Sequence, residues 1–398
     1  MPTFAEAHDL VAWLERRLPE YLEELRQLCA LECPTDSKPG VDEAAAWVRA
    51  WAVRRGWETR TYPDEVAGDS VVVRVRGRGR LRALLAAHLD TVYPVGTAAA
   101  RPLRIEGDRL LAPGSCDNKS GLLSALYAAA ALEDLGLLDP IGMLTIMCGS
   151  DEETDMRVSI ALLRDLAPAH DIALVLEAAR ENGDIVSARK GGAHFVLEAH
   201  GRAAHAGVEP HRGANAILAI ARQIVALQGL NGMREGMTLN VGVVQGGTRP
   251  NVVPDYARAD IDVRVVRPED RAPVEAALTA IAADPGVPGV TATLGGGWGA
   301  APMPKTPEIA RLAALTSACA TELGFTVNDA ATGGVSYANH LAGLGLPVLD
   351  GLGPVGGLDH SPREYILVSS IVPRTALLAL LLLRAAQQGG FQRGQSPP

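Results

Sequence analysis

The sequence predicts an α/β fold, in which a mostly parallel sheet flanked by helices is interrupted by an inserted α+β domain. Short apolar runs alternate with segments of helical periodicity up to residue 177, which is typical of βα units. Strands of alternating polarity follow, and the α/β pattern resumes after a Gly- and Pro-rich stretch at 295–307. We therefore expect an outer domain of residues 1–189 and 300–398 and an inserted domain of residues 190–299.

The outer domain is expected to begin with two helices. The first has apolar residues at helical spacing and is stopped by Pro34. The later run at 81–87 is almost continuously apolar, as strands buried in parallel sheets are. In chain order, the predicted elements are helices 4–31 and 41–56, strands 71–75 and 81–89, helix 120–135, strands 143–147 and 172–176, helix 308–323, strand 347–349 and helix 371–386.

The inserted domain is expected to have the element order β-α-β-β-α-β. Its predicted elements are strand 193–199, helix 214–227, strands 238–244 and 256–265, helix 268–282 and strand 290–294. This order is typical of a four-stranded antiparallel sheet with two helices on one face.

Composition excludes several classes of protein. The chain of 398 residues has a formal net charge of -9 and no run of Lys and Arg, which argues against nucleic acid or an anionic membrane as a partner. The longest continuous apolar stretch, at 376–383, is too short to span a bilayer, and residues 1–14 lack the pattern of a secretory signal. We therefore expect a cytoplasmic protein. Its five cysteines are scattered, so a disulfide framework is not expected.

Histidine and acidic residues stand where predicted strands and loops end. Because the carboxyl ends of parallel strands lie at one edge of a sheet, we expect these side chains to converge there. Each residue alone is more often a solvated cap or a structural group, but the combination favours a site. The residues are His88, Asp90, Asp117, Glu152, Glu153, Glu177 and His360.

Two histidines and three carboxylates suit a pair of divalent cations, for which zinc is the first choice and cobalt or manganese are alternatives. Two cations can activate a water molecule and polarise a carbonyl group. A further carboxylate that binds no metal can move the proton from that water to a leaving nitrogen. The adjacent Glu152 and Glu153 can divide these roles, because neighbouring side chains of an extended segment point opposite ways.

These motifs resemble those of the dinuclear zinc metallopeptidase family that includes glutamate carboxypeptidase (carboxypeptidase G), aminoacylase and succinyl-diaminopimelate desuccinylase. The resemblance extends from the segment at 31–35 to the C-terminal helix. It implies a zinc-peptidase catalytic domain with two metal ions and Glu152 as general base and then general acid. The implied metal ligands are His88 and Glu177 for one ion, Glu153 and His360 for the other, and Asp117 for both, with Asp90 orienting His88.

The resemblance also implies that the inserted domain is a lid and dimerisation domain, so that the protein is a homodimer. His205 would stabilise the oxyanion at a neighbouring active site, and Asn251 and Arg264 would contact substrate. An arginine suits a carboxylate, because it can bind both oxygens. The backbone of Gly333 and Gly334 would line the substrate pocket, but Tyr337 stands where the family commonly has Asp, which leaves the substrate open.

The expected function is therefore a metal-dependent amidohydrolase of the carboxypeptidase type. It would cleave the amide between an acyl or peptidyl group and an amino acid with a free carboxylate, in a small molecule or a short peptide. The alternatives are an aminoacylase, a dipeptidase or an aminopeptidase of the same family. A non-catalytic small-molecule binding protein ranks lower, because Glu152 and all five ligands are present.

Overall fold

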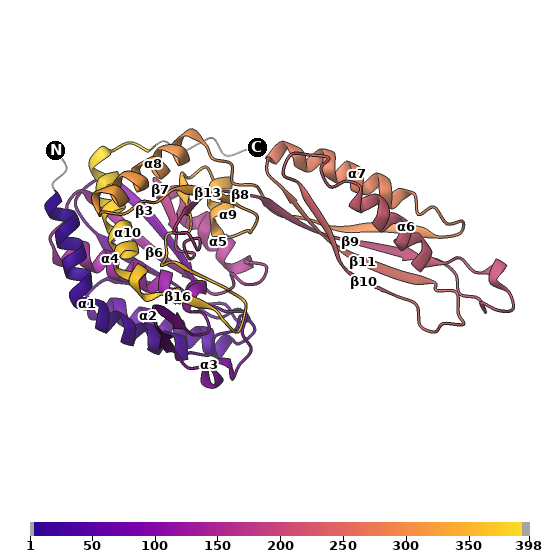
Figure 1. Cartoon of the computed structure of the whole chain (residues 1–398), viewed down its shortest axis with the longest axis horizontal. Coiled ribbons are helices and arrows are strands. Elements are labelled where there is room, and N and C mark those ends of the chain that lie inside the picture. Colours follow the sequence, from indigo (N-terminus) through magenta and orange to yellow (C-terminus); the bar gives the residue numbers. More distant parts are fainter. Residues whose placement is uncertain (1–3, 392–398) are drawn as a thin grey trace. The chain divides into compact units, whose positions relative to one another are not determined.

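The computed structural model describes residues 4–391 and divides them into two units (Figure 1). Unit 1 contains the chain up to Ser187, Lys305–Ala331 and the chain from Ser336 on. Unit 2 contains Ala188–Pro304 and Thr332–Val335.

The main sheet of unit 1 has six strands in the order β1-β2-β6-β3-β7-β14. Its strands are β1 (Glu58–Tyr62), β2 (Ser70–Arg76), β3 (Leu81–His88), β6 (Ile141–Gly149), β7 (Ile172–Val175) and β14 (Val348–Leu349). Strand β3 runs parallel to β6 and β7, and β14 runs parallel to β7, whereas β1 and β2 join the sheet in antiparallel pairs. The predicted mostly parallel sheet is thus confirmed. Strand β1 was not predicted, because its sequence is polar throughout and lacks a buried residue.

Helices cover this sheet. They are α1 (Phe4–Ala30), α2 (Lys38–Arg54), α3 (Thr97–Ala100), α4 (Ser120–Asp134), α5 (Arg157–Leu166), α8 (Pro307–Glu322), α9 (Tyr337–Gly343) and α10 (Val368–Gln388). Helix α10 packs against α1, α4 and α8. Helix α10 contains an 18-residue window that is apolar enough to cross a membrane, with a mean hydropathy of 1.6, yet 78% of this window is buried. A buried core helix has this composition for packing reasons alone.

Two smaller sheets of the chain were not predicted. Strand β8 (Ile185–Arg189) pairs with β13 (Asp329–Thr332), and a four-stranded sheet has the order β15-β16-β5-β4. The strands of the latter are β4 (Arg104–Glu106), β5 (Arg109–Leu111), β15 (Gly356–Gly357) and β16 (Tyr365–Leu367). They have two or three residues each, which is too short to give a periodic pattern.

Unit 2 is built on a four-stranded antiparallel sheet in the order β10-β11-β9-β12. Its elements are β9 (Gly191–His200), α6 (Ala216–Gln228), β10 (Thr238–Gly246), β11 (Tyr256–Val265), α7 (Arg271–Ala283) and β12 (Thr291–Ala300). Alternate residues of the central strands, such as Phe195 and its partner Ile261, are buried with apolar residues of α6 and α7. Figure 1 shows both helices on one side of the sheet, so the predicted inserted fold is confirmed.

One segment joins a different unit from the expected one. Thr332–Val335 belongs to unit 2, although it lies within the range expected for the outer domain. The backbone N–H of Lys190 donates to the carbonyl of Thr332 at 3.0 Å, and the Arg189 guanidinium donates to the carbonyl of Gly334 at 3.0 Å. These bonds form between segments that are distant in sequence, so no local pattern indicates them.

Candidate metal centre

His88 is the last residue of β3, and its side chain is fully buried. Its Nε2 lies 2.9 Å from Oδ1 of Asp117 and 3.9 Å from Oε1 of Glu177. Asp117 belongs to the turn η1 (Ser115–Lys119) before α4, and Glu177 follows β7. Because β7 is the direct parallel neighbour of β3, the two strands end together and bring His88 and Glu177 to one place.

A second group shares Asp117. The Nε2 of His360 lies 3.2 Å from Oδ2 of Asp117 and 3.1 Å from Oε2 of Glu153. Glu153 belongs to the turn after β6, and His360 lies in the turn before β16. The side chain of His360 is 51% exposed, and its φ of 58° places it in the left-handed region, which is unfavourable for a residue with a β-carbon. The surrounding loop must therefore hold His360 in place.

The two groups fit a pair of cations. Within each group the possible ligand atoms lie within 4.8 Å of one another, and the two oxygens of Asp117 divide between the two histidines. The side chain of Glu153 is 6% exposed, and its Oε1 has no hydrogen-bond partner among the described residues. An oxygen buried in this way is costly unless it is satisfied, and a divalent cation satisfies a carboxylate oxygen.

The electrostatics of the cluster also favour bound cations. Burial opposes the charged form of His88, but hydrogen bonds with Asp117 and Asp90 outweigh it and raise the pKa of His88 well above its usual value. Hydrogen bonds with Asp117 and Glu153 raise the pKa of His360 to about 11. The carboxylates thus attract positive charge, which a bound cation can supply in place of protons.

Asp90 connects His88 with the neighbouring glutamates. The backbone carbonyl of Asp90 lies 3.0 Å from Nδ1 of His88, and its Oδ1 lies 3.3 Å from the same nitrogen. Because a carbonyl can only accept, Nδ1 carries the proton, and Nε2 is left to face Asp117. The Asp90 carboxylate also accepts the backbone N–H groups of Glu152 and Glu153, each at 3.1 Å, and the hydroxyl of Thr35 at 2.6 Å. Sequence reasoning missed this second task.

Glu152 and Glu153 occupy consecutive positions of a turn. The expectation that they lie in an extended segment, with side chains on opposite faces, is therefore wrong. The turn after β6 and the bonds to Asp90 decide their directions instead. Burial raises the pKa of Glu152 well above its usual value, and the negative charges of Glu177 and Asp117 raise it further.

Tyr337 is a core residue. It is fully buried, and its hydroxyl donates to Oγ of Ser159 at 2.8 Å. The Ser159 hydroxyl in turn donates to Asp151 at 2.5 Å, directly before Glu152. A β-carbon at Gly149, the last residue of β6, would meet the Tyr337 hydroxyl at 2.0 Å. Tyr337 therefore supports the turn that carries the glutamates and is not exposed to a substrate.

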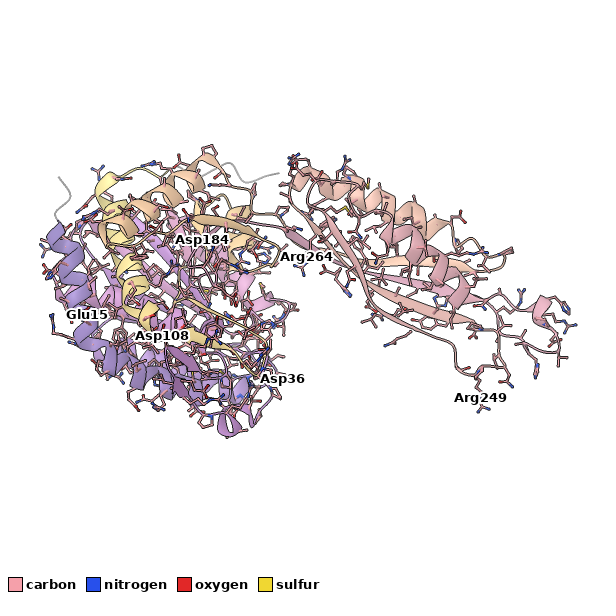
Figure 2. The ribbon with its side chains drawn as sticks, viewed as in Figure 1. Glu15, Asp36, Asp108, Asp184, Arg249 and Arg264 are labelled. Atoms are coloured by element: carbon pink, nitrogen blue, oxygen red, sulfur yellow. The ribbon has the colours of Figure 1, made fainter. Side chains whose placement is uncertain are left out.

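The candidate substrate residues of unit 2 lie in two places, His205 with Asn251 in one and Arg264 near Val335 in the other. His205 and Asn251 are neighbours, since the N–H of Ala206 donates to the Asn251 carbonyl at 3.0 Å. Arg264 lies near the far end of β11, and Figure 2 shows it and Arg249 at opposite ends of the sheet. Arg264 lies eight residue steps, or about 27 Å, from Tyr256 at the start of β11, and Asn251 precedes Tyr256. One copy of unit 2 therefore does not bring Arg264 to Asn251. Gly333 and Gly334 lie in the segment bonded to Arg189 and Lys190.

Arg264 is held by its own strand. Its Nε lies 2.9 and 3.0 Å from the two carboxylate oxygens of Asp262, and its Nη2 lies 2.8 Å from Oδ2. The side chain of Arg264 is still 31% exposed. The ion pair with Asp262 thus orients the guanidinium group while leaving part of it accessible.

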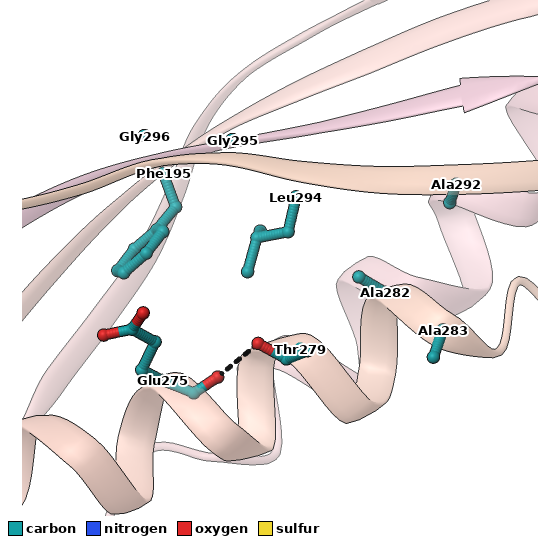
Figure 3. Close-up of a pocket in the computed structure, with 9 residues that line it drawn as sticks. All are labelled: Phe195, Glu275, Thr279, Ala282, Ala283, Ala292, Leu294, Gly295 and Gly296. Carbon is teal, nitrogen blue, oxygen red and sulfur yellow. Dashed lines mark hydrogen bonds between the residues drawn. The ribbon is translucent and has the colours of Figure 1, made fainter.

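Unit 2 also has a pocket of about 280 Å³ between α7 and β12 (Figure 3). Phe195, Leu294 and three alanines line much of it. Its charged residue Glu275 accepts the indole N–H of Trp298 at 3.1 Å. None of the candidate site residues lines this pocket.

Comparisons with known proteins show what this chain is similar to. Residues 187–290 match the family described as the peptidase dimerisation domain. Carboxypeptidase G2 from Pseudomonas sp. (strain RS-16) is 28% identical over 92% of this chain and 89% of its own. Acetylornithine deacetylase from Myxococcus xanthus is 29% identical over 63% of this chain and 68% of its own.

Solved structures show the same fold. An M20 family metallo-carboxypeptidase from Sulfolobus solfataricus superposes with a TM-score of 0.73 at 16% identity, covering 92% of this chain and 98% of its own. Both units of the fold are included in this coverage. The chain is therefore similar in sequence to carboxypeptidase G2 and acetylornithine deacetylase, and it has the fold of the M20 family metallo-carboxypeptidase.

Proposed function

We propose that this protein is a metal-dependent amidohydrolase of the carboxypeptidase type. It cleaves the amide between an acyl or peptidyl group and an amino acid that carries a free carboxylate. The observation that carries the proposal is the shared carboxylate of Asp117, whose oxygens lie 2.9 Å from Nε2 of His88 and 3.2 Å from Nε2 of His360. The likeness to carboxypeptidase G2 along 92% of the chain supports this reaction class.

Two divalent ions fit the donor set, with zinc first and cobalt or manganese as alternatives. His88 and Glu177 would hold one ion, Glu153 and His360 would hold the other, and Asp117 would serve both. When bound, such a pair lowers the pKa of water and polarises a carbonyl oxygen.

Glu152 moves the proton. As general base it takes a proton from the attacking water, and as general acid it returns this proton to the leaving nitrogen. Burial raises the pKa of Glu152, and this supports the role, because a raised pKa makes the carboxylate a stronger base. Asp90 holds the backbone of Glu152 through a hydrogen bond of 3.1 Å.

Residues of the inserted domain contact one substrate from two copies of the chain. Arg264 binds the free carboxylate of the substrate, and His205 with Asn251 stabilises the oxyanion at the site of the partner. The separation of about 27 Å along β11 supports this division. Exposed apolar residues of α6 and the edge strand β10 support dimerisation through unit 2: Ile217, Leu218, Val225, Val243 and Val244.

Metal content and turnover test the proposal together. Protein purified without added metal should contain about two divalent ions per chain and release an amino acid from a panel of N-acyl and dipeptide substrates. Glu152→Gln should keep the ions and lose turnover. The control is Asp155→Asn, because Asp155 is an exposed carboxylate of the same turn. Metal-free protein that gains no activity with zinc, cobalt or manganese would contradict the proposal.

Mixed dimers test the action of His205 in trans. His205→Ala and Glu152→Gln are each expected to be inactive. Random exchange of their subunits makes half of the dimers mixed, and each mixed dimer has one intact site, so roughly a quarter of wild-type activity should return. If mixing restores nothing although the subunits exchange, His205 acts in its own subunit or not at all.

A further inference from the structure

Glu364 lies beside the turn that carries Asp117 because of the small sheet of unit 1. Strand β16 follows Glu364 directly and pairs with β5, with Tyr365 opposite Leu111. This pairing brings Glu364 against the chain between β5 and α4, which contains η1. Its side chain is buried, with 2% exposure.

The Glu364 carboxylate accepts three backbone hydrogen bonds from this one segment. Its Oε2 accepts the N–H of Gly114 at 2.9 Å, and its Oε1 accepts the N–H of Cys116 at 2.8 Å and of Asp117 at 3.0 Å. A buried carboxylate is costly unless its oxygens are satisfied, and N–H groups that point to a charged acceptor form strong bonds. These bonds therefore determine the backbone conformation from which the Asp117 side chain extends.

The segment of Glu364 also carries His360, four residues earlier. The hydroxyl of Tyr93 donates to the Ser361 carbonyl at 2.9 Å and anchors the same segment. Glu364 thus connects the His360 turn with the Asp117 turn. The distance of 3.2 Å between Oδ2 of Asp117 and Nε2 of His360 depends on this connection.

We propose that Glu364 is a positioning residue for the shared ligand Asp117 and thereby sets the metal affinity of the centre. The proposal rests on the proposed function, because it assigns Asp117 to two cations. Glu364 touches neither cation nor substrate. It acts through the backbone of residues 114–117 and through the spacing between Asp117 and His360.

Glu364→Gln is the informative variant. Its side chain has nearly the same shape, but one carboxylate oxygen becomes an NH2 group, which faces a backbone N–H and cannot accept from it. We expect the affinity for zinc, measured by competition with a chromophoric chelator, to fall by about 10- to 100-fold. The visible absorption of the cobalt-substituted protein should change, and kcat should fall while KM stays within about twofold.

Two controls accompany this variant. Asp108→Asn removes another carboxylate that lies next to β5. The Asp108 carboxylate accepts hydrogen bonds from the backbone N–H of Ser369 at 2.8 Å and from its hydroxyl at 2.6 Å. This variant should leave zinc affinity and the cobalt spectrum unchanged. Asp117→Ala is the reference variant in which the shared ligand is lost completely. A purely structural role of Glu364 would lower the denaturation midpoint of the metal-free protein without changing these two readouts.

The outcomes separate this inference from the proposed function. If wild type and Asp108→Asn bind two cations and Glu364→Gln matches them in affinity and cobalt spectrum, the inference about Glu364 is wrong while the proposed function stands. If wild type binds no cation, the proposed function itself fails. Should Glu364→Gln not fold, as judged by circular dichroism, Glu364→Asp is titrated instead. It keeps the charge on a shorter side chain, and wild-type affinity in it would overturn the inference.

Discussion

The two halves of the candidate metal centre are built differently. His88 is fully buried at the end of β3, and Glu177 follows the neighbouring parallel strand β7. In the other half, Glu153 and His360 belong to turns, and His360 is 51% exposed with a φ of 58°. We call the first the strand half and the second the loop half.

Different forces hold the ligands of the two halves in place. The strand half is positioned by the hydrogen-bond ladder between β3 and β7, which changes only if the sheet opens. The loop half depends on individual hydrogen bonds that backbone N–H groups donate to carboxylates, such as Glu153 to Asp90 and Asp117 to Glu364. Each such bond contributes about 1.5–3 kcal/mol, because its acceptor is charged. Substitutions of the residues that accept these bonds should therefore adjust the loop half, whereas substitution of a buried ligand should also destabilise the strand half.

The largest effects are expected for substitutions of the two histidines, one of which lies in each half. His88→Ala should lower both the metal content and the thermal stability, because it leaves a cavity and unpaired acceptors in a buried site. His360→Ala should remove one of two ions with little change in thermal stability. Turnover should fall by more than about 100-fold in both variants. This loss is larger than the loss expected when a residue that only orients a ligand is replaced. Equal loss of stability in the two variants would break the comparison.

Asp90→Asn should have an intermediate effect, because Asp90 contacts both halves. Asn keeps the backbone carbonyl that faces His88, but it presents only one acceptor oxygen to the N–H groups of Glu152 and Glu153. We expect metal affinity or kcat to fall by about 10- to 100-fold, with two ions still bound at high metal concentration. Complete metal loss, measured by elemental analysis, would instead make Asp90 a direct ligand.

Tyr337→Phe should have a smaller effect on the support of the loop half. The change removes the hydroxyl that donates to Ser159 and leaves the ring in place. The free energy of unfolding should fall by about 1 kcal/mol, as for one buried hydrogen bond. KM should be unchanged, because Tyr337 is fully buried. A changed preference among substrates in the N-acyl panel would show that this position acts on substrate after all.

A further expected effect concerns pH and the helices behind the loop half. His340 lies in α9, which packs against α5, and burial with the charge of Arg164 lowers the pKa of His340 from 6.5 to about 4. The unfolded chain binds a proton near pH 6.5 and the folded chain does not, so His340 lowers the free energy of unfolding as pH falls from 6.5 to 4. The loss should be on the order of 2 kcal/mol.

Urea unfolding of wild type and His340→Gln at pH 7, 5 and 4, both with chelator present, measures this effect. Wild type should lose stability relative to the variant as the pH falls. A constant difference between the two proteins over this range would show that His340 is not held neutral by the fold.

The sequence alone determined the fold class and the residues that form the candidate centre. Apolar runs such as 81–87 indicate buried strands, and His88, Asp117 and Glu177 stand at the ends of predicted elements, so local patterns and the geometry of parallel sheets suffice to bring them together. The inserted antiparallel sheet follows in the same way from alternation along its strands.

The contacts that hold these residues in place come from tertiary packing. The turn at Glu152 and Glu153, the burial of Tyr337, the separation of Asn251 from Arg264 and the contact of Glu364 with the Asp117 turn depend on pairings between distant segments. The strands that position Glu364 have two or three residues, which is too few for a period to be recognised. Periodicity predicts which face of an element is buried. The segment that packs against this face depends on contacts between residues distant in the sequence.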